Sequence, residues 1–430
     1  MLGLSQVGVT VAAFCAQILL ARTLPQSAFG TFSAALAVMA LAAPLVVFGV
    51  SELWLQRFGL EGHAARRWVR PSLRLVGSIC VGVLAAAVLW SLVGSAEPDT
   101  TTVRMLLPSV IVAQVGLTLV ASAQQLRGDY RGLSVLQVAP HVGRVLVVFA
   151  AWAIGLSVVD VAAGYAVVAL LTVVACVRVL RPFVAGTAQL EGHQSTEVTA
   201  ITDVPVSRVV GAATPFVLGN VFYLMGIYLG TVVAAEVLGT EAAAVLAVPM
   251  AVLTAAYLVP RVVYQQYFLA KLHRWAHGDR DAVLLAYRFG TSGMIALGIL
   301  VAALVALGGQ LLPVLLGAEY GDSAAVLALL ALAIPFRFGG AAVAALLTSG
   351  GLLRRKVVQQ GIGALVLLAA LAVATPLWGL RGTASATVVA EAVLCVLFWV
   401  TVRRRVVRGA DLPSWRDLRQ RLTRGIPSAS

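Results

Sequence analysis

Four charged side chains lie inside long apolar runs of this sequence, where charge is rare: Glu52, Arg144, Arg337 and Glu391. Placing each one in a membrane-spanning helix costs on the order of 3 kcal/mol, so each needs a chemical reason. A planar guanidinium suits the oxygens of a phosphate, whereas carboxylate and imidazole side chains can carry protons. His141 lies one helical turn before Arg144 and shares its face. These residue types indicate anion binding, proton transfer or both within an apolar environment.

Arg144, Arg337 and Glu391 fall at a similar depth in their runs, because a helix rises about 1.5 Å per residue. Two interpretations stay open, and in the first both arginines face a water-filled cavity and bind the phosphate groups of a ligand. In the second, Arg337 and Glu391 neutralise each other as an ion pair. Arg144 then hydrogen-bonds to backbone carbonyl groups or to His141. A buried neutral ring is a simpler explanation of His141 than a proton relay.

The cysteines and histidines do not predict a metal site or a disulfide. All four cysteines fall inside apolar runs: Cys15, Cys80, Cys176 and Cys395. A disulfide framework needs paired cysteines in oxidising aqueous loops, and no cluster of cysteine and histidine has the spacing of metal ligands. We therefore expect small buried thiols, no metal and no cofactor.

The composition indicates a membrane protein. Of the 430 residues, 60% are hydrophobic and 11% are charged, whereas soluble domains carry about 25% charged residues. Apolar runs of about 20 residues recur along the whole chain, and each can cross a hydrocarbon core of about 30 Å as a helix. The sequence therefore predicts an all-α polytopic protein of the plasma (inner) membrane.

The apolar runs, divided at charged residues, prolines and glycines, predict about twelve transmembrane helices. Their expected ranges are 4–22, 30–56, 75–95, 105–126, 133–155, 159–180, 209–233, 242–260, 289–316, 324–348, 357–376 and 383–402. Ala21–Leu41 aligns without gaps to Ala235–Leu253, and such a repeat predicts two pseudo-symmetric six-helix lobes around a central cavity. The expected parts are an N-terminal lobe at 1–182, a cytoplasmic linker at 183–208, a C-terminal lobe at 209–402 with an interfacial amphipathic segment at 261–288, and a basic cytoplasmic tail at 403–430.

Charge on the loops predicts the orientation. With the N-terminus inside, all but five of the 31 lysines and arginines fall on the cytoplasmic side, as the positive-inside rule requires. The exceptions are Arg22, Arg104 and Arg381 outside, and Arg144 and Arg337 within helices. Both termini are therefore expected in the cytoplasm. The net charge of +13 points to membrane lipids rather than nucleic acid as partners, because the basic residues lie at helix ends on one side.

Several motifs resemble those of one family of membrane proteins. Leu20-Ala21-Arg22-Thr23-Leu24-Pro25 with Ala28-Phe29-Gly30, and Gly49-Val50-Ser51 leading to Arg57, are similar to the start of polysaccharide-repeat (Wzx-type) flippases of the MOP exporter superfamily. In the second half, Leu315-Leu316-Gly317-Ala318-Glu319-Tyr320 and Gly379-Leu380-Arg381-Gly382-Thr383-Ala384 resemble elements after helix 9 and at the start of the last helix. The resemblance spans nearly the whole chain. The chain departs from it by having about twelve helices where some relatives have fourteen.

The resemblance implies a transporter that flips a lipid-linked oligosaccharide, carried on polyprenyl diphosphate, from inner to outer leaflet by alternating access, for cell-surface polysaccharide biosynthesis. Such a headgroup cannot cross hydrocarbon unaided, so a wet cationic cavity is expected while the tail stays in lipid. In relatives the first two helices of each half line the cavity, which favours Gln17, Arg22, Glu52, Asn220 and Tyr223. The depth argument favours Arg144 and Arg337, and both sets stay open. Polysaccharide-assembly proteins are further candidate partners.

Two other functions stay open. A MATE-like exporter of drugs or small molecules, coupled to a cation, would need acidic cavity residues rather than arginines. A membrane-embedded glycosyltransferase or polymerase would need a large external loop or an exposed acidic motif, and the external loops are short, so we do not expect an enzyme. Three groups could couple transport to H⁺ or Na⁺: Glu52, His141 and Glu391. Glu52 could instead form an ion pair with Arg57.

Overall fold

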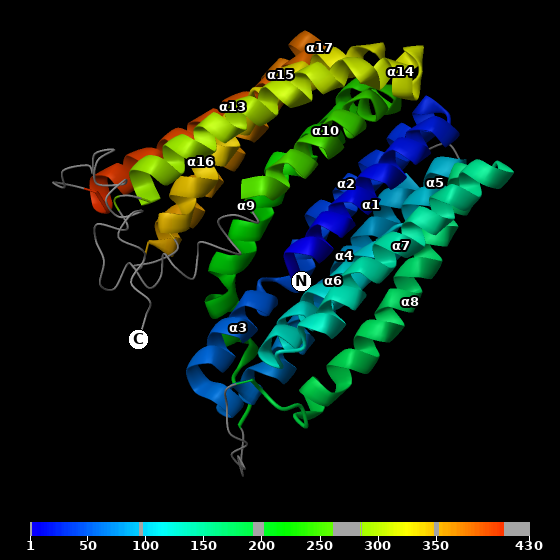
Figure 1. Cartoon of the computed structure of the whole chain (residues 1–430). Helices are drawn as coiled ribbons and strands as arrows, with labels where there is room; N and C mark the ends of the chain where they lie inside the picture. The colour runs from blue at the N-terminus through cyan, green and yellow to red at the C-terminus, as the bar shows by residue number, and fades with distance from the viewer. Residues whose placement is uncertain are drawn as a thin grey trace.

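The computed structural model describes residues 2–93, 98–191, 202–260, 284, 286–347 and 352–407. Within these ranges the regular elements are helices and no strand is present (Figure 1). Their bounds are α1 (Leu2–Thr23), α2 (Gln26–Val47), α3 (Val50–Glu61), η1 (Gly62–Trp68), α4 (Val69–Val93), α5 (Pro98–Leu106), α6 (Pro108–Leu126), α7 (Tyr130–Ile154), α8 (Val158–Ala185), α9 (Val206–Leu238), α10 (Thr240–Pro260), η3 (Ala286–Gly290), α13 (Thr291–Gly308), η4 (Gly309–Leu311), α14 (Leu312–Leu316), η5 (Ala318–Tyr320), α15 (Gly321–Ala331), α16 (Ala333–Leu346) and α17 (Leu353–Arg405). The predicted amphipathic segment at 261–288 and most of the tail at 403–430 lie outside the described residues.

Nine helical stretches within the described residues are long and apolar enough to cross a membrane. Two of the nine are composite. Gln26–Leu92 includes α2, α3, η1 and most of α4, and Leu353–Arg405 is α17, which is broken at Gly379 (φ 59°, ψ −140°). A shorter apolar helix, Gly8–Thr23, lies within α1. The all-α polytopic fold is thus confirmed, whereas the count of twelve, the domain boundaries and the central cavity stay predictions.

The predicted helix at 30–56 is wrong, because the chain breaks between α2 and α3. Phe48 and Gly49 both adopt left-handed backbone conformations, with φ of 50° and 68°, and only glycine does so readily. Gly49 also packs closely against α9. A Cβ atom at this position would lie 2.7 Å from Cβ of Phe216 and 2.8 Å from the carbonyl oxygen of Ala213. Contact with the other half of the chain therefore requires glycine at this break.

Other predicted ranges differ at breaks that apolar composition hides. The helix predicted at 289–316 is divided into α13, η4 and α14, and the helix predicted at 324–348 is divided into α15 and α16. The helix predicted at 105–126 is α6, which begins at Pro108 after the separate helix α5; proline favours the first turn of a helix. The helices predicted at 357–376 and 383–402 are joined in α17 through the kink at Gly379. Hydrophobicity marks membrane spans but not their interruptions.

The two halves of the chain meet along α2. In the first half α1 packs on α7, and α6 packs on α2 and α8; in the second, α9 and α16 pack on α17, and α13 packs on α16 (Figure 1). One buried cluster joins Phe29 and Phe32 of α2 to Ala244 and Val248 of α10. Because lipid tails are as apolar as these side chains, van der Waals packing drives such contacts more than the hydrophobic effect does.

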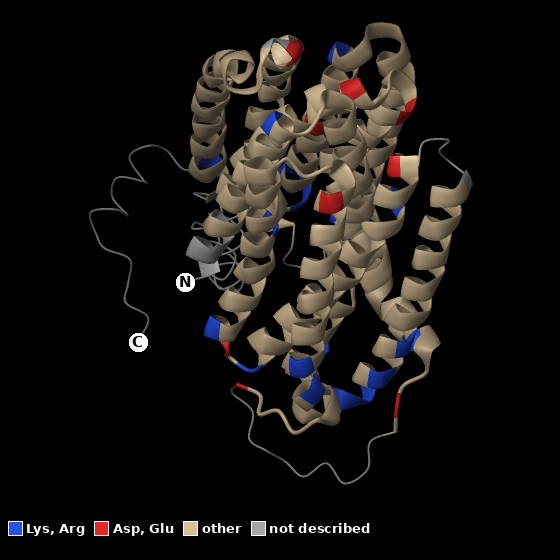
Figure 2. Ribbon diagram, turned by 90° about the vertical axis from the view of Figure 1, so that its right-hand side faces the viewer, with Lys and Arg blue, Asp and Glu red and all other residues tan. Residues whose placement is uncertain are grey.

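Charged residues gather at the two ends of the molecule (Figure 2). The end formed by η1 and the end of α8, which we call the basic end, carries Arg66, Arg67 and Arg181. The opposite end, which we call the acidic end, carries Asp160 at the start of α8 and Glu241 at the start of α10. This separation agrees with the charge bias of the loops. Which end faces the cytoplasm stays a prediction.

The segment between the two halves is tied at both ends to η1. Arg66 Nη2 donates a hydrogen bond to the carbonyl oxygen of Ala185 at 3.0 Å, where α8 ends. The backbone N–H of Val204, just before α9, donates to the carbonyl oxygen of Arg67 at 3.2 Å. Helices α8 and α9 therefore extend into the linker predicted at 183–208, and its two ends lie close together.

The cysteines are less buried than the sequence predicted. Cys176 is buried, but Cys80 and Cys395 are half-buried and Cys15 is exposed on α1. In a membrane bundle the outer faces of helices contact lipid, which accepts a small apolar side chain as readily as protein does. An apolar run therefore does not by itself predict burial within the protein.

Candidate functional site

Arg337 on α16 forms a buried ion pair with Glu391 on α17. Arg337 Nη1 lies 2.8 Å from Glu391 Oε1, and the two side chains are 11% and 6% exposed. This ion pair is one of the two interpretations that the sequence offered, and it is confirmed. A guanidinium neutralised in this way offers less charge to a phosphate in this conformation, so the part of Arg337 in ligand binding stays a prediction.

Two tyrosines enclose this ion pair. The guanidinium carbon of Arg337 lies 4.4 Å from the ring centre of Tyr223 on α9 and 4.8 Å from that of Tyr257 on α10. A desolvated cation–π contact is worth about 2 kcal/mol, which helps to offset the cost of burying the charges. Helix α9 also lies close to the carboxylate at Gly226, where an added Cβ atom would be in ordinary van der Waals contact with Glu391 Oε1, at 3.6 Å. The cluster therefore links α9, α10, α16 and α17.

Arg144 on α7 has no comparable acidic partner. Among the described residues no carboxylate oxygen lies within 4.0 Å of its guanidinium, and its Nε is buried without a hydrogen-bond partner there. The guanidinium carbon lies 5.4 Å from the ring centre of Tyr165 on α8, and Tyr228 on α9 is within electrostatic reach. A positive charge held this way inside a span lacks compensation, and a bound anion would supply it.

Tight packing fixes the side chains around Arg144. Tyr165 is 4% exposed, and its ring packs edge-on against Phe32 of α2 with centroids 5.0 Å apart, a favourable geometry for two aromatic rings. The predicted cavity residue Gln17 on α1 is engaged elsewhere, since its Nε2 donates a weak hydrogen bond to Ser33 Oγ of α2 at 3.5 Å. The predicted hydrogen bonds from Arg144 to His141 or to carbonyl groups are not formed within the described residues.

Glu52 on α3 connects the two halves of the chain through α9. Its Oε1 accepts a hydrogen bond from Asn220 Nδ2 of α9 at 2.9 Å, while its Oε2 is buried without a partner in the described part of the chain. The ion pair of Glu52 with Arg57 that the sequence suggested is wrong. Arg57 Nη1 instead lies 3.4 Å from Glu61 Oε1, one turn further along α3. Glu52 is therefore free of a cationic partner among the described residues.

Arg22 closes the acidic end of the molecule rather than lining a site near Arg144. Its Nε donates a hydrogen bond to the carbonyl oxygen of Leu315 on α14. Beside it, Gln26 Nε2 donates to the carbonyl oxygen of Glu319 at 3.3 Å. These contacts join the first two helices of the chain to the turn between α14 and α15, so in this conformation Arg22 is engaged between the two halves.

Two further contacts complete this closure. The hydroxyl of Tyr320 donates to the carbonyl oxygen of Ala21 at 3.3 Å, and burial, with a smaller effect of the Glu319 charge, raises the pKa of Tyr320 to about 12. The phenol therefore stays a donor at neutral pH. Gly30 meets α10 so closely that a Cβ atom would lie 1.7 Å from the carbonyl oxygen of Thr240, so no larger residue fits without separating the halves.

Sequence reasoning missed the aromatic partners of both arginines, which are Tyr165, Tyr228 and Tyr257. Each lies in an apolar run, where a tyrosine cannot be told from an ordinary residue of the hydrophobic core. A tyrosine hydroxyl in a span does need a polar neighbour, so mid-span tyrosines were the available signal. Of the predicted residues, the structure brings Tyr223, Arg337 and Glu391 together, and Glu52 with Asn220.

The fold is that of the MOP superfamily transporters. An inward-facing multidrug resistance MATE family transporter superposes with a TM-score of 0.67 and 17% identity, over 93% of this chain and 94% of the other. The lipid II flippase MurJ in an inward closed conformation gives 0.66 and 10%, over 93% and 87%. A MOP transporter from Pyrococcus furiosus, described as having a binding pocket of reversed polarity, gives 0.60 and 15%, over 94% and 95%.

The sequence itself identifies the family. The family model described as "Polysaccharide biosynthesis protein" matches residues 1–268, more than half of the chain. The chain therefore belongs to the polysaccharide biosynthesis protein family, as its motifs indicated. A comparison with curated proteins gives no significant match.

Proposed function

We propose that this protein moves a lipid-linked oligosaccharide, carried on polyprenyl diphosphate, from the inner to the outer leaflet of the plasma membrane by alternating access. The observation that carries the proposal is the state of Arg144, an arginine in an apolar helix that no carboxylate neutralises among the described residues. A diphosphate supplies the missing negative charge, and the guanidinium fork matches its oxygens. Membership of a polysaccharide biosynthesis family supports the sugar.

The position of Arg144 suits a ligand that is passed between the two halves. Arg144 belongs to α7 of the first half, while Tyr228, within its electrostatic reach, belongs to α9 of the second. A headgroup bound at Arg144 would therefore contact both halves. In transporters built from repeats, rocking of one half against the other exposes such a site to each side in turn.

Export of a cationic compound is the competing function, and the acidic residues argue against it. Glu391 is neutralised by Arg337 at 2.8 Å, and Glu52 accepts a hydrogen bond from Asn220 at 2.9 Å. Glu52 keeps one buried oxygen without a partner among the described residues, which suits a small coupling ion, H⁺ or Na⁺, better than a bulky cation. We therefore assign coupling to Glu52 and headgroup binding to Arg144.

The test is transport in vesicles that contain the purified protein and a fluorescent polyprenyl-diphosphate oligosaccharide. Arg144→Gln keeps the length and polarity of the side chain and removes its charge. We expect its flipping rate to fall at least about tenfold, since a hydrogen bond to a charged group is worth about 1.5–3 kcal/mol. Arg104→Gln is the matched control, because Arg104 also stacks on an aromatic ring, Trp90, at 4.2 Å, but at the acidic end.

Two results would reject the proposal. One is an unchanged flipping rate in Arg144→Gln. The other is a wild-type protein that moves cationic dyes but not the oligosaccharide lipid, which would favour the drug exporter. An equal loss of flipping in Arg104→Gln and Arg144→Gln would also count against it, because the effect would then not belong to the central charge.

A further inference from the structure

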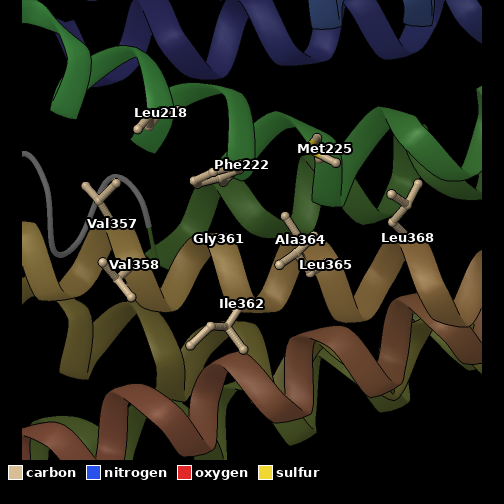
Figure 3. A pocket seen from close by; sticks show the side chains of 10 residues that line it. All are labelled: Leu218, Phe222, Met225, Val357, Val358, Gly361, Ile362, Ala364, Leu365 and Leu368. Atoms are coloured by element: carbon tan, nitrogen blue, oxygen red, sulfur yellow. The ribbon is translucent and has the colours of Figure 1, made fainter.

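A narrow apolar groove runs between α9 and the first part of α17 (Figure 3). Its volume is about 410 Å³, within the range of about 300–1,000 Å³ that is usual for ligand sites. The lining residues are all apolar. They are Leu218, Phe222 and Met225 of α9, and Val357, Val358, Gly361, Ile362, Ala364, Leu365 and Leu368 of α17.

Small residues on α17 keep the groove open but narrow. A Cβ atom at Gly361 would lie 3.1 Å from the ring of Phe222, so the ring lies directly over the glycine. Ala364, one turn later, continues the same small-residue floor beneath Met225 (Figure 3). The groove is therefore bounded by α9 on one side and by this small-residue floor of α17 on the other, and it runs along both helices.

The groove opens toward the basic end of the molecule. Phe222 faces Gly361, and Gly219 faces Val357 at 3.7 Å, so α9 and the start of α17 run in the same direction. Helix α9 starts beside η1 at the basic end, and α17 starts on the same side but nine residues further along, about 14 Å at about 1.5 Å per residue. The groove residues 357–368 then extend about 17 Å along the helix, at about 1.5 Å per residue. This is about half of a hydrocarbon core of about 30 Å.

Two exposed arginines lie at the mouth of the groove. Arg354 and Arg355 are exposed and precede Val357 and Val358 by one helical turn, so they share the face of α17 that lines the groove. Arginine at the level of the lipid headgroups binds phosphate. The mouth is therefore cationic and the interior apolar, a pattern that matches a lipid with a phosphate head.

We propose that this groove binds the isoprenoid chain of a polyprenyl phosphate lipid, with the phosphate at Arg354 and Arg355. A polyprenyl phosphate joins one apolar chain to a phosphate, which matches an apolar groove with two exposed arginines at its mouth, and membership of a polysaccharide biosynthesis family favours this carrier over a glycerophospholipid. The proposal rests on the proposed function, because it assigns the carrier of the transported sugar to a docking site. Asn220 and Tyr223 of the same helix do not line the groove and contact Glu52 and Arg337 instead, so the groove would hold the tail apart from these polar groups while the sugar is handled among them.

The experiment uses the full-length protein in vesicles of phosphatidylethanolamine and phosphatidylglycerol, with a sugar-free undecaprenyl phosphate that carries a photoreactive group in its chain. Labelled residues are mapped by mass spectrometry. We expect labels on Phe222, Met225 and Ile362, and competition by unlabelled undecaprenyl phosphate but not by phosphatidylglycerol. Equal labelling by a photoreactive phosphatidylglycerol, or no competition, would show an ordinary lipid-covered surface and overturn the proposal.

Variants that fill the groove sharpen this test. Gly361→Leu fills it from the floor, and Leu365→Trp fills it from a position that is already 67% exposed, which leaves folding undisturbed. Each should reduce labelling about tenfold, equivalent to about 1.4 kcal/mol. The matched control is Gly293→Leu on α13, an exposed glycine with no atom within 4 Å of an added Cβ. Loss of labelling in that control as well, or in none of the three, contradicts the groove.

Charge variants test the mouth. Arg354→Gln with Arg355→Gln should weaken competition by undecaprenyl phosphate about tenfold and leave competition by undecaprenol unchanged. Arg404→Gln with Arg405→Gln, an exposed pair at the other end of α17, should change neither. The assay needs no sugar and no transport. Groove labelling that persists while the Arg144 test fails rejects the flippase alone, and transport without groove labelling rejects the groove alone.

Discussion

Two arginines of the same predicted depth have opposite surroundings in this protein. Arg337 is paired with Glu391 at 2.8 Å and enclosed by Tyr223 and Tyr257. Arg144 stacks on Tyr165 at 5.4 Å, and no carboxylate neutralises it among the described residues. The charge of Arg337 is therefore neutralised within the protein, whereas the proposed function assigns a bound anion to neutralise the charge of Arg144.

This difference between Arg337 and Arg144 indicates that a buried charge in a membrane protein can serve either to join helices or to bind a ligand. A neutralised pair joins four helices of one half, and breaking it exposes an uncompensated charge to a low dielectric. An arginine without a counter-charge costs free energy in a span, and such residues commonly mark ligand or ion sites. Variants at the two sites should therefore separate stability from transport.

The largest expected effect is on stability at the ion pair. Glu391→Ala leaves Arg337 buried without its carboxylate, and we expect a loss of about 3–5 kcal/mol, the usual cost of breaking a buried pair from one side. Thermal unfolding of the purified protein in detergent measures this loss. Arg144→Ala should leave the same unfolding temperature unchanged or raised, because no pair is broken there.

A double replacement decides whether the charges or their volume matter at the pair. Arg337→Met combined with Glu391→Leu keeps an apolar cluster of similar size, and it should recover most of the stability that Glu391→Ala loses. A double variant as unstable as the single one would mean that the pair is needed as such. Arg337, like Arg144, would then be needed for its charge.

The next largest effect is expected from a variant that gives Arg144 an ion pair like that of Arg337. His141→Glu places a carboxylate one helical turn before Arg144, within reach of an ion pair on the same helix face. The new pair should neutralise Arg144, and flipping of the oligosaccharide lipid should fall about tenfold while the unfolding temperature is maintained. His141→Gln is the control and should transport normally. Full activity of His141→Glu would show that an open charge at Arg144 is not required.

The membrane fold and the candidate charges could be predicted from the sequence, but the neighbours of those charges could not. Apolar runs with intervening arginines are a local signal, and they led to α1, α7 and α8 with small errors at the ends. The partner of Arg337 lies 54 residues away, and only packing of α16 against α17 brings it close. The break at Gly49 likewise depends on contact with α9, which no local pattern records.

A smaller effect is expected at the contact between halves. If Glu52 carries the coupling ion, Glu52→Gln keeps the size of the group and removes its titration, so transport should lose its dependence on an imposed H⁺ or Na⁺ gradient. We expect about a fivefold lower rate under a gradient, the low end of typical coupling. Asn220→Ala removes the 2.9 Å hydrogen bond and keeps the carboxylate, so it should retain the gradient dependence. A gradient response that survives Glu52→Gln assigns coupling elsewhere.

The smallest effect concerns the closure of the acidic end. Tyr320→Phe removes one hydrogen bond between the halves, to Ala21, worth about 0.5–1.5 kcal/mol. Burial raises the pKa of this phenol from 10.0 to about 12, so the bond is intact below pH 10 and is lost as pH rises toward 12. The population with separated halves should therefore rise by about two- to tenfold in Tyr320→Phe, and by the same factor at pH 6 and pH 9.

Spin labels at Ile154 and Val237 measure this population. Both positions are exposed, at 74% and 48%. Ile154 is the last residue of α7 in the first half, and Val237 lies near the end of α9 in the second half. Tyr130→Phe, which alters an exposed tyrosine at the start of α7, should leave the distance distribution unchanged. A Tyr320→Phe effect that is present at pH 6 but lost at pH 9 would mean that the wild-type phenol is already ionised at pH 9, and so has a pKa below its ordinary value instead of above it. The closure would then depend on Arg22 and the close approach at Gly30 rather than on a buried donor.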